Sequence, residues 1–170
     1  KGALAAAEAA VRKLLFPART QDAGQSGEQF LRCTWATRRP AWADRLACAW
    51  LIRRFVDPEG SILWLDKAQA CPQGAQSFAF DGARFGNSAS KVTFEAMLKR
   101  FELADNAALA KIGAIVHFLE VRENPVPEAA GVQTLLQGAQ RRSTGDADLL
   151  AEAEKTFDLL YEAYFEAPKQ

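Results

Sequence analysis

Three arginines and an aspartate gather in a short segment that links a predicted strand to a predicted helix. Arg38 and Arg39 follow the strand, and Asp44 and Arg45 stand at the start of the helix. Guanidinium groups carry positive charge and forked donors that match an oxyanion, and a helix N-terminus adds free N–H groups and a partial positive charge. Ligands of parallel α/β sheets bind beyond the carboxyl ends of the strands. The segment therefore predicts an oxyanion-binding site formed by Arg38, Arg39, Asp44 and Arg45.

A purely structural interpretation of the same segment stays open. Arginines at helix starts often pair with surface carboxylates, and Asp44 would then only cap its own helix. Cys48 lies one helical turn after Asp44 among apolar neighbours. It fits a packed small hydrophobe better than a reactive thiol.

A second group of titratable residues lies in the later, helical part of the chain. His117 is the single histidine, and Glu120 follows it by three residues on the same predicted helix face. A histidine and a glutamate at this spacing can share a metal ion in helical sites. Glu95, His117 and Glu120 are therefore candidate ligands of a divalent metal, although zinc sites usually require three or four protein ligands. The alternative is a boundary histidine that is hydrogen-bonded to Glu120.

Glu95 lies at a predicted helix start, and small residues precede His117 on its helix. Glu95 lies near the start of a helix predicted to begin at Thr93, where the helix dipole favours a carboxylate. A reciprocal capping box is not expected, because an N-cap at Thr93 would require the acid one position later. Ala110 and Gly113 lie seven and four residues before His117. Their small side chains would allow another element or a ligand to approach this helix closely.

Hydrophobic periodicity and helix breakers predict a helix-rich α/β fold. We expect strands at 30–37, 61–65 and 77–80, with a helix from 44 to about 55 that forms a βαβ unit with a right-handed crossover. Helices are expected at 93–101, 105–120 and 128–142, followed by a last helix with an apolar stripe from Leu149 to Tyr164. The result is a small sheet of about three strands surrounded by helices.

Size and composition indicate one domain with balanced charge. The chain has 170 residues, of which 49% are hydrophobic, and a core of ordinary size suits this length. Residues 1–28 are predicted to form a helix at 3–15 and a linker at 18–28 from an upstream region, and 29–170 form the domain. The 21 basic and 21 acidic residues argue against a free-standing nucleic-acid binder and suggest no membrane partner. Three cysteines without a C-x-x-C pair favour a reducing cytoplasm.

The residues around the arginine segment resemble the signature of the chromate-resistance protein family of the ChrB type. The resemblance rests on Trp35-Ala36-Thr37-Arg38, on Pro40 and on the run from Asp44 to Pro58, and it covers nearly the whole chain. Further similar blocks lie at 14–17, 80–85, 93–95, 115–117, 127–129 and 157–161.

The resemblance implies a part in bacterial chromate resistance, usually beside a chromate efflux transporter. Longer members of the family carry an upstream domain and are regarded as chromate-responsive regulators of the resistance operon. We therefore expect a cytoplasmic regulatory or sensor domain whose ligand is chromate or a similar oxyanion. The expected partners are an upstream DNA-binding domain in the full-length protein and a second copy in a homodimer, with no membrane partner.

Two positions depart from the family pattern and keep other functions open. Asn87 stands where family members often have a histidine, and Phe118 stands where an acid often follows His117. If the family residues bind a metal, this chain lacks part of the set, because asparagine is a weak ligand of transition metals. A metal-dependent enzyme or chromate reductase and a degenerate oligomerisation scaffold remain alternatives. No flavin or nicotinamide fingerprint, P-loop or reactive cysteine pair is present in the sequence, so we favour the sensor over an enzyme.

Overall fold

A small parallel sheet forms one side of the structure. The computed structural model describes residues 30–165, so the predicted helix at 3–15, the linker at 18–28 and the proposed boundary at 28–29 lie outside the described residues. β1 (Thr34–Arg38) pairs in parallel with β2 (Ser61–Leu65) and with β3 (Gln76–Ser77), in the order β2-β1-β3. The helix α2 connects β1 to β2, which confirms the predicted βαβ unit and the helix-rich α/β class.

β1 begins at Thr34 rather than at residue 30, because the preceding segment is bound to a buried carboxylate. Arg32 has a left-handed backbone with a φ of 56°. The N–H groups of Arg32 and Cys33 donate to the carboxylate of Asp57 at 2.9 and 2.8 Å. Trp35 donates to the same carboxylate through Nε1 at 3.0 Å. These donors therefore satisfy Asp57 instead of extending the strand.

β3 is shorter than the predicted strand at 77–80. After Ser77, Phe78 forms an isolated parallel bridge with Phe85, and Ala79 adopts a φ of 58°. A non-glycine residue in this left-handed region interrupts an extended strand. Residues 78–85 consequently form a loop at the carboxyl edge of the sheet.

The crossover helix is fixed to the last helix by a buried polar cluster. α2 (Ala43–Leu51) continues into the π-helical turn η1 (Ile52–Val56), in agreement with the predicted helix to about residue 55. Trp50 Nε1 and Arg54 Nη1 both donate to Oδ1 of Asp158 at 2.7 Å. Asp158 lies in α6 (Asp146–Tyr164) and is only 3% exposed. A buried carboxylate with two donors holds α2 and α6 in one arrangement.

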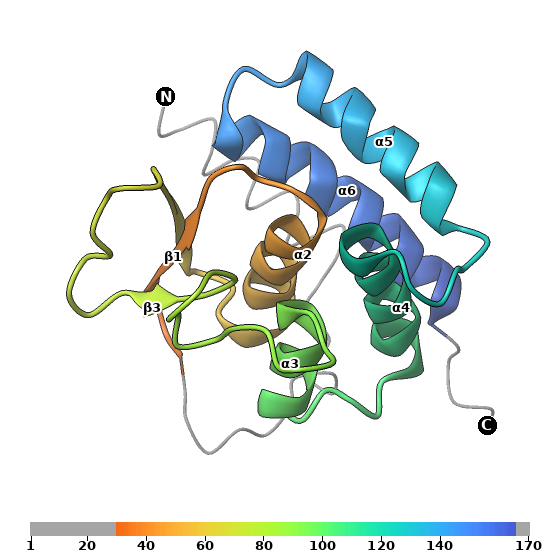
Figure 1. Cartoon of the computed structure of the whole chain (residues 1–170), viewed down its shortest axis with the longest axis horizontal. Helices are drawn as coiled ribbons and strands as arrows, with labels where there is room; N and C mark the ends of the chain where they lie inside the picture. The colour runs from red at the N-terminus through yellow and green to blue at the C-terminus, as the bar shows by residue number, and fades with distance from the viewer. Residues whose placement is uncertain (1–29, 166–170) are drawn as a thin grey trace.

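Three more helices, two of which pack against α2, complete the structure on the side of α2 away from the sheet. They are α3 (Thr93–Arg100), α4 (Ala107–Val121) and α5 (Ala129–Arg142). Figure 1 shows α2 between β1 and α4, with α5 lying along the outer side of α6, and α2 packs against α3, α4 and α6. α4 begins later than predicted, because Asn106 is its N-cap and accepts the N–H of Leu109 at 3.1 Å. Within residues 30–165, no helix is long and apolar enough to cross a bilayer.

Candidate functional site

Arg38 lies at the carboxyl end of β1 and reaches over the loop that follows β2. Its Nη1 donates to the carbonyl oxygens of Asp66, Lys67 and Gln69 at 2.9, 3.2 and 2.8 Å. Its guanidinium carbon lies 4.7 Å from the ring centroid of Phe80, within cation–π range. Arg38 is therefore held in place by backbone oxygens on one side and an aromatic face on the other.

Arg45 lies in the first turn of α2 and reaches the loop after β3. Its Nε donates to the carbonyl oxygen of Ala79 at 2.9 Å, and its Nη1 donates to that of Pro40 at 3.1 Å. Arg45 and Arg38 thus contact two adjacent residues, Ala79 and Phe80 respectively. The structure brings these two predicted site residues to the carboxyl edge of the sheet, where ligands of parallel sheets bind.

Arg39 points elsewhere. Its Nη1 lies 2.8 Å from Oδ1 of Asp66, and its Nε lies 2.6 Å from Oδ2 of Asp146 at the start of α6. These hydrogen bonds, first to Asp146 and then to Asp66, raise the pKa of the Arg39 guanidinium. Pairing with surface carboxylates is the structural role that the sequence left open, and Arg39 is the arginine of the segment that shows it.

Asp44 caps a neighbouring helix rather than its own. The side chain accepts the N–H groups of Thr93 and Phe94, the first residues of α3, at 3.1 and 2.9 Å. The Asp44 N–H in turn donates to Oε1 of Glu120 in α4 at 2.9 Å. Asp44 therefore connects α2 to both α3 and α4, which corrects the expectation of a local cap.

Burial changes the acid–base properties of Asp44 and of its neighbour Cys48. Desolvation raises the pKa of the Asp44 carboxyl, and the Glu120 carboxylate adds to the rise, whereas the N–H groups of Phe94 and Thr93 lower it. Burial and the adjacent Asp44 raise the pKa of the Cys48 thiol well above its ordinary value. Cys48 is fully buried, so it is packed rather than reactive, as the sequence indicated.

Glu95 links α3 to the histidine of α4. The N-cap of α3 is Val92 and not Thr93, so Glu95 occupies the third helical position and its Oε2 accepts the Val92 N–H at 3.1 Å. The same oxygen lies 2.8 Å from Nδ1 of His117. The predicted N-cap was wrong by one residue, and Glu95 makes half of a capping box because Val92 has no side-chain acceptor to return the bond.

His117 therefore has a different partner from the one expected on its own helix. Glu120 binds the Asp44 N–H, and Glu95 from α3 contacts His117. Nε2 of His117 is buried and has no hydrogen-bond partner among residues 30–165. In the same part of the chain, no three histidine, cysteine, aspartate or glutamate side chains are close enough to hold one metal ion. Of the predicted metal ligands, the structure brings together Glu95 and His117 and directs Glu120 elsewhere.

Asn87 joins the same network from the loop before α3. Its Oδ1 accepts the hydroxyl of Thr93 at 2.6 Å, and the N–H of Thr93 donates to Asp44. Asn87, one of the two positions that depart from the family pattern, is thus linked through Thr93 to Asp44, the neighbour of Arg45. The long sequence separation between Asn87 and Asp44 left no local signal for this link.

The comparisons with known proteins agree on one family. The model of the ChrB C-terminal domain matches residues 35–164. The curated Protein ChrB from Cupriavidus metallidurans is 44% identical over 136 residues, which cover 80% of this chain and 42% of that protein. The chain thus spans less than half the length of this relative, and no solved structure matches it significantly. The chain therefore belongs to the ChrB C-terminal domain family.

Proposed function

We propose that this domain is a chromate-responsive sensor of a bacterial chromate-resistance protein. The observation that carries the proposal is the meeting of Arg38 and Arg45 at Ala79 and Phe80. The arginines come from the end of β1 and the start of α2, and the loop follows β3. This places two guanidinium groups and a helix N-terminus at the edge of the sheet that typically binds ligands.

The chemistry of the two arginines suits a tetrahedral dianion such as chromate. Within residues 30–165, the hydrogen bonds of Arg38 use Nη1, and those of Arg45 use Nε and Nη1. Nη2 of both side chains therefore remains for an oxyanion, and both side chains are partly exposed. Charge-assisted hydrogen bonds to an oxyanion are stronger than bonds to neutral carbonyl groups. An oxyanion would consequently compete with the Ala79 carbonyl for Arg45.

This competition offers a route from ligand binding to a change in shape. Release of the Ala79 carbonyl would free the loop after β3, and Asp44, next to Arg45, is bonded to α3 and α4. In the full-length protein, we propose that this change reaches an upstream DNA-binding domain in the cytoplasm. A homodimer, the commonest symmetric assembly of soluble proteins, would suit such a regulator.

A second candidate function rests on the contact between Glu95 and His117. A carboxylate within 2.8 Å of an imidazole can serve general acid–base chemistry or provide two ligands to a divalent metal. The buried Nε2 of His117 fits this alternative because it still has a position for a proton, a metal or a substrate atom. Metal-dependent stabilisation that is lost in His117→Ala would favour this alternative.

Calorimetric titration with chromate and with sulfate tests the proposed function. We expect wild type to bind chromate in preference to sulfate and Arg45→Ala to lose at least about tenfold in chromate affinity. Arg39→Ala is the matched control, because Arg39 carries the same charge nearby but does not contact Ala79 or Phe80. Equal chromate affinities in all three proteins, or no binding by a folded wild type, would contradict the proposal.

A further inference from the structure

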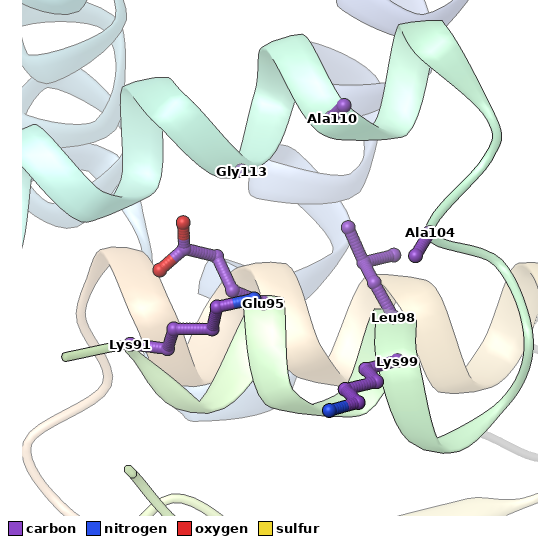
Figure 2. Close-up of a pocket in the computed structure, with 7 residues that line it drawn as sticks. All are labelled: Lys91, Glu95, Leu98, Lys99, Ala104, Ala110 and Gly113. Carbon is purple, nitrogen blue, oxygen red and sulfur yellow. The ribbon is translucent and has the colours of Figure 1, made fainter. Parts of the chain in front are cut away.

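A pocket lies between α3 and α4, away from the arginines at the sheet edge. Its volume is about 380 Å³, which falls in the range of small-molecule sites. One wall carries charged side chains of α3 and of Lys91, which precedes the N-cap of α3, and the facing wall includes small residues of α4 (Figure 2). The lining residues are Lys91, Glu95, Leu98, Lys99, Ala104, Ala110 and Gly113.

The charged wall carries two lysines and one glutamate, whose charges alternate in sign along the sequence. Glu95 and Lys99 are four residues apart in α3, which would ordinarily allow an ion pair along one helix face, and Lys91 precedes the helix. Figure 2 shows instead the Glu95 carboxylate turned towards α4, where it contacts His117. Neither lysine has an ion-pair partner within the described part of the chain. The pocket lining thus includes two positive charges and one negative charge.

The carboxylate of Glu95 is held in a fixed orientation. Oε2 of Glu95 accepts the Val92 N–H at 3.1 Å and lies 2.8 Å from Nδ1 of His117. Among residues 30–165, Oε1 has no hydrogen-bond partner. A ligand with a positively charged donor would therefore find an acceptor that is already positioned.

Gly113 gives the pocket depth at a cost to its helix. Glycine is among the least favourable residues in a helix interior. A Cβ at Gly113 would lie 3.5 Å from Cγ of Glu95 and 3.6 Å from Cδ1 of Phe94, which are ordinary contact distances. Packing between α3 and α4 therefore has room for an alanine, and glycine at this position leaves that space open.

We propose that this pocket binds a free acidic amino acid such as glutamate. Its ammonium group would contact Glu95, and its two carboxylates would contact Lys91 and Lys99. The aliphatic part would lie against Leu98 and the small residues of α4. The charge pattern of the ligand is the reverse of that of the wall, and its net charge of about −1 opposes the +1 sum of the three side chains. The proposal is independent of chromate binding at the sheet edge.

Titration of the whole chain with L-glutamate and with glutarate tests the proposal, because glutarate lacks only the ammonium group. We expect glutamate to bind at least about tenfold more tightly than glutarate, and Glu95→Gln to lose at least about tenfold in glutamate affinity. Glutamine keeps an acceptor for the Val92 N–H, so the helix start survives. Lys155→Ala is the control for loss of a surface charge, because Lys155 lies in α6 and pairs with Glu152.

A second variant tests the pocket without the charge change that Glu95→Gln introduces. Gly113→Ala alters no polar group and fills the floor of the pocket, so glutamate affinity should fall while the fold is kept. Equal affinities for glutamate and glutarate would overturn the proposal, as would no glutamate binding by wild type. A loss in Lys155→Ala as large as in Glu95→Gln would also overturn it.

Discussion

The sheet edge and the α3–α4 pocket differ in the charges that they carry and in the partners of those charges. At the sheet edge, Arg38 and Arg45 are held by neutral backbone carbonyl oxygens, so their positive charge is kept. The α3–α4 pocket is instead lined by the carboxylate of Glu95 and by Lys91 and Lys99, two lysines that have no ion-pair partner within residues 30–165. The first arrangement suits a simple dianion and the second suits a zwitterion. The two regions should therefore have different ligands.

Asp44 is the residue that connects the two regions. It is next to Arg45 in the sequence, and it binds the start of α3 and the side chain of Glu120 in α4. Changes at Asp44 should affect both regions, whereas changes within one region should leave the other intact.

The largest expected effect is that of Asp44→Ala on stability. The N–H groups of Thr93 and Phe94 belong to fully buried residues and would lose their acceptor. Unsatisfied buried groups of this kind cost about 1–3 kcal/mol each, so we expect a loss of about 3 kcal/mol in the free energy of unfolding. Urea unfolding measures it. Asp81→Ala, at an exposed loop aspartate, should change stability by less than about 0.5 kcal/mol. Equal effects of the two substitutions would refute the connecting role of Asp44.

A smaller effect is expected for His117→Ala, which changes only the α3–α4 region. Loss of the contact with Glu95 should lower the free energy of unfolding by about 1–2 kcal/mol. Chromate affinity should stay within about twofold of wild type, because the hydrogen-bond partner of His117 among residues 30–165 is Glu95 and not a residue of the sheet edge. Urea unfolding and calorimetry together check both parts. A strong loss of chromate binding in the folded variant would mean that the two regions form one site.

Gly113→Ala should raise stability slightly. Alanine favours a helix interior over glycine by up to about 1 kcal/mol, and the new methyl group meets neighbours at ordinary distances. The midpoint of urea unfolding should therefore rise. A clear fall would show that α3 and α4 cannot accept a side chain here, and the argument for an open pocket floor would lose its basis.

The smallest expected effect is a pH dependence that belongs to Asp44. Burial raises the pKa of its carboxyl above the ordinary value of 3.8, so the folded protein holds this proton more tightly than the unfolded chain does. The contribution of Asp44 to stability therefore falls as the pH rises above 3.8, until the folded-state pKa is passed. Asp44→Asn should lack this contribution. Urea unfolding of both proteins over this pH range should show wild type losing stability relative to the variant as the pH rises, and the reverse trend would be inconsistent with a raised pKa.

Local patterns predicted the elements well, because strand and helix periodicity depend on near neighbours. The βαβ unit and the helices were found in this way, and Arg38 and Arg45 were selected because they follow a strand and begin a helix. The pairing of Glu95 with His117 was among the predicted combinations of metal ligands. The partners of Asp44 were not predicted, since they come from elements far away in the sequence. The helix α3 begins at Thr93 as predicted, but its N-cap at Val92 was missed, because the acceptor for the first N–H groups of α3 is supplied by Asp44 of another helix. The small residue at 113 did signal a close approach, and Glu95 is the residue that comes nearest to it.

A two-ligand NMR titration of the isotope-labelled chain tests the central claim most directly. If chromate binds at the sheet edge, the backbone amide signals of Arg45, Ala79 and Phe80 should shift first, and those of Lys99 and Gly113 should stay in place. Glutamate should produce the opposite pattern. In Arg45→Ala, the chromate shifts should disappear while the glutamate shifts remain. Chromate shifts centred on the α3–α4 pocket, or chromate shifts at the sheet edge that persist in Arg45→Ala, would contradict the account.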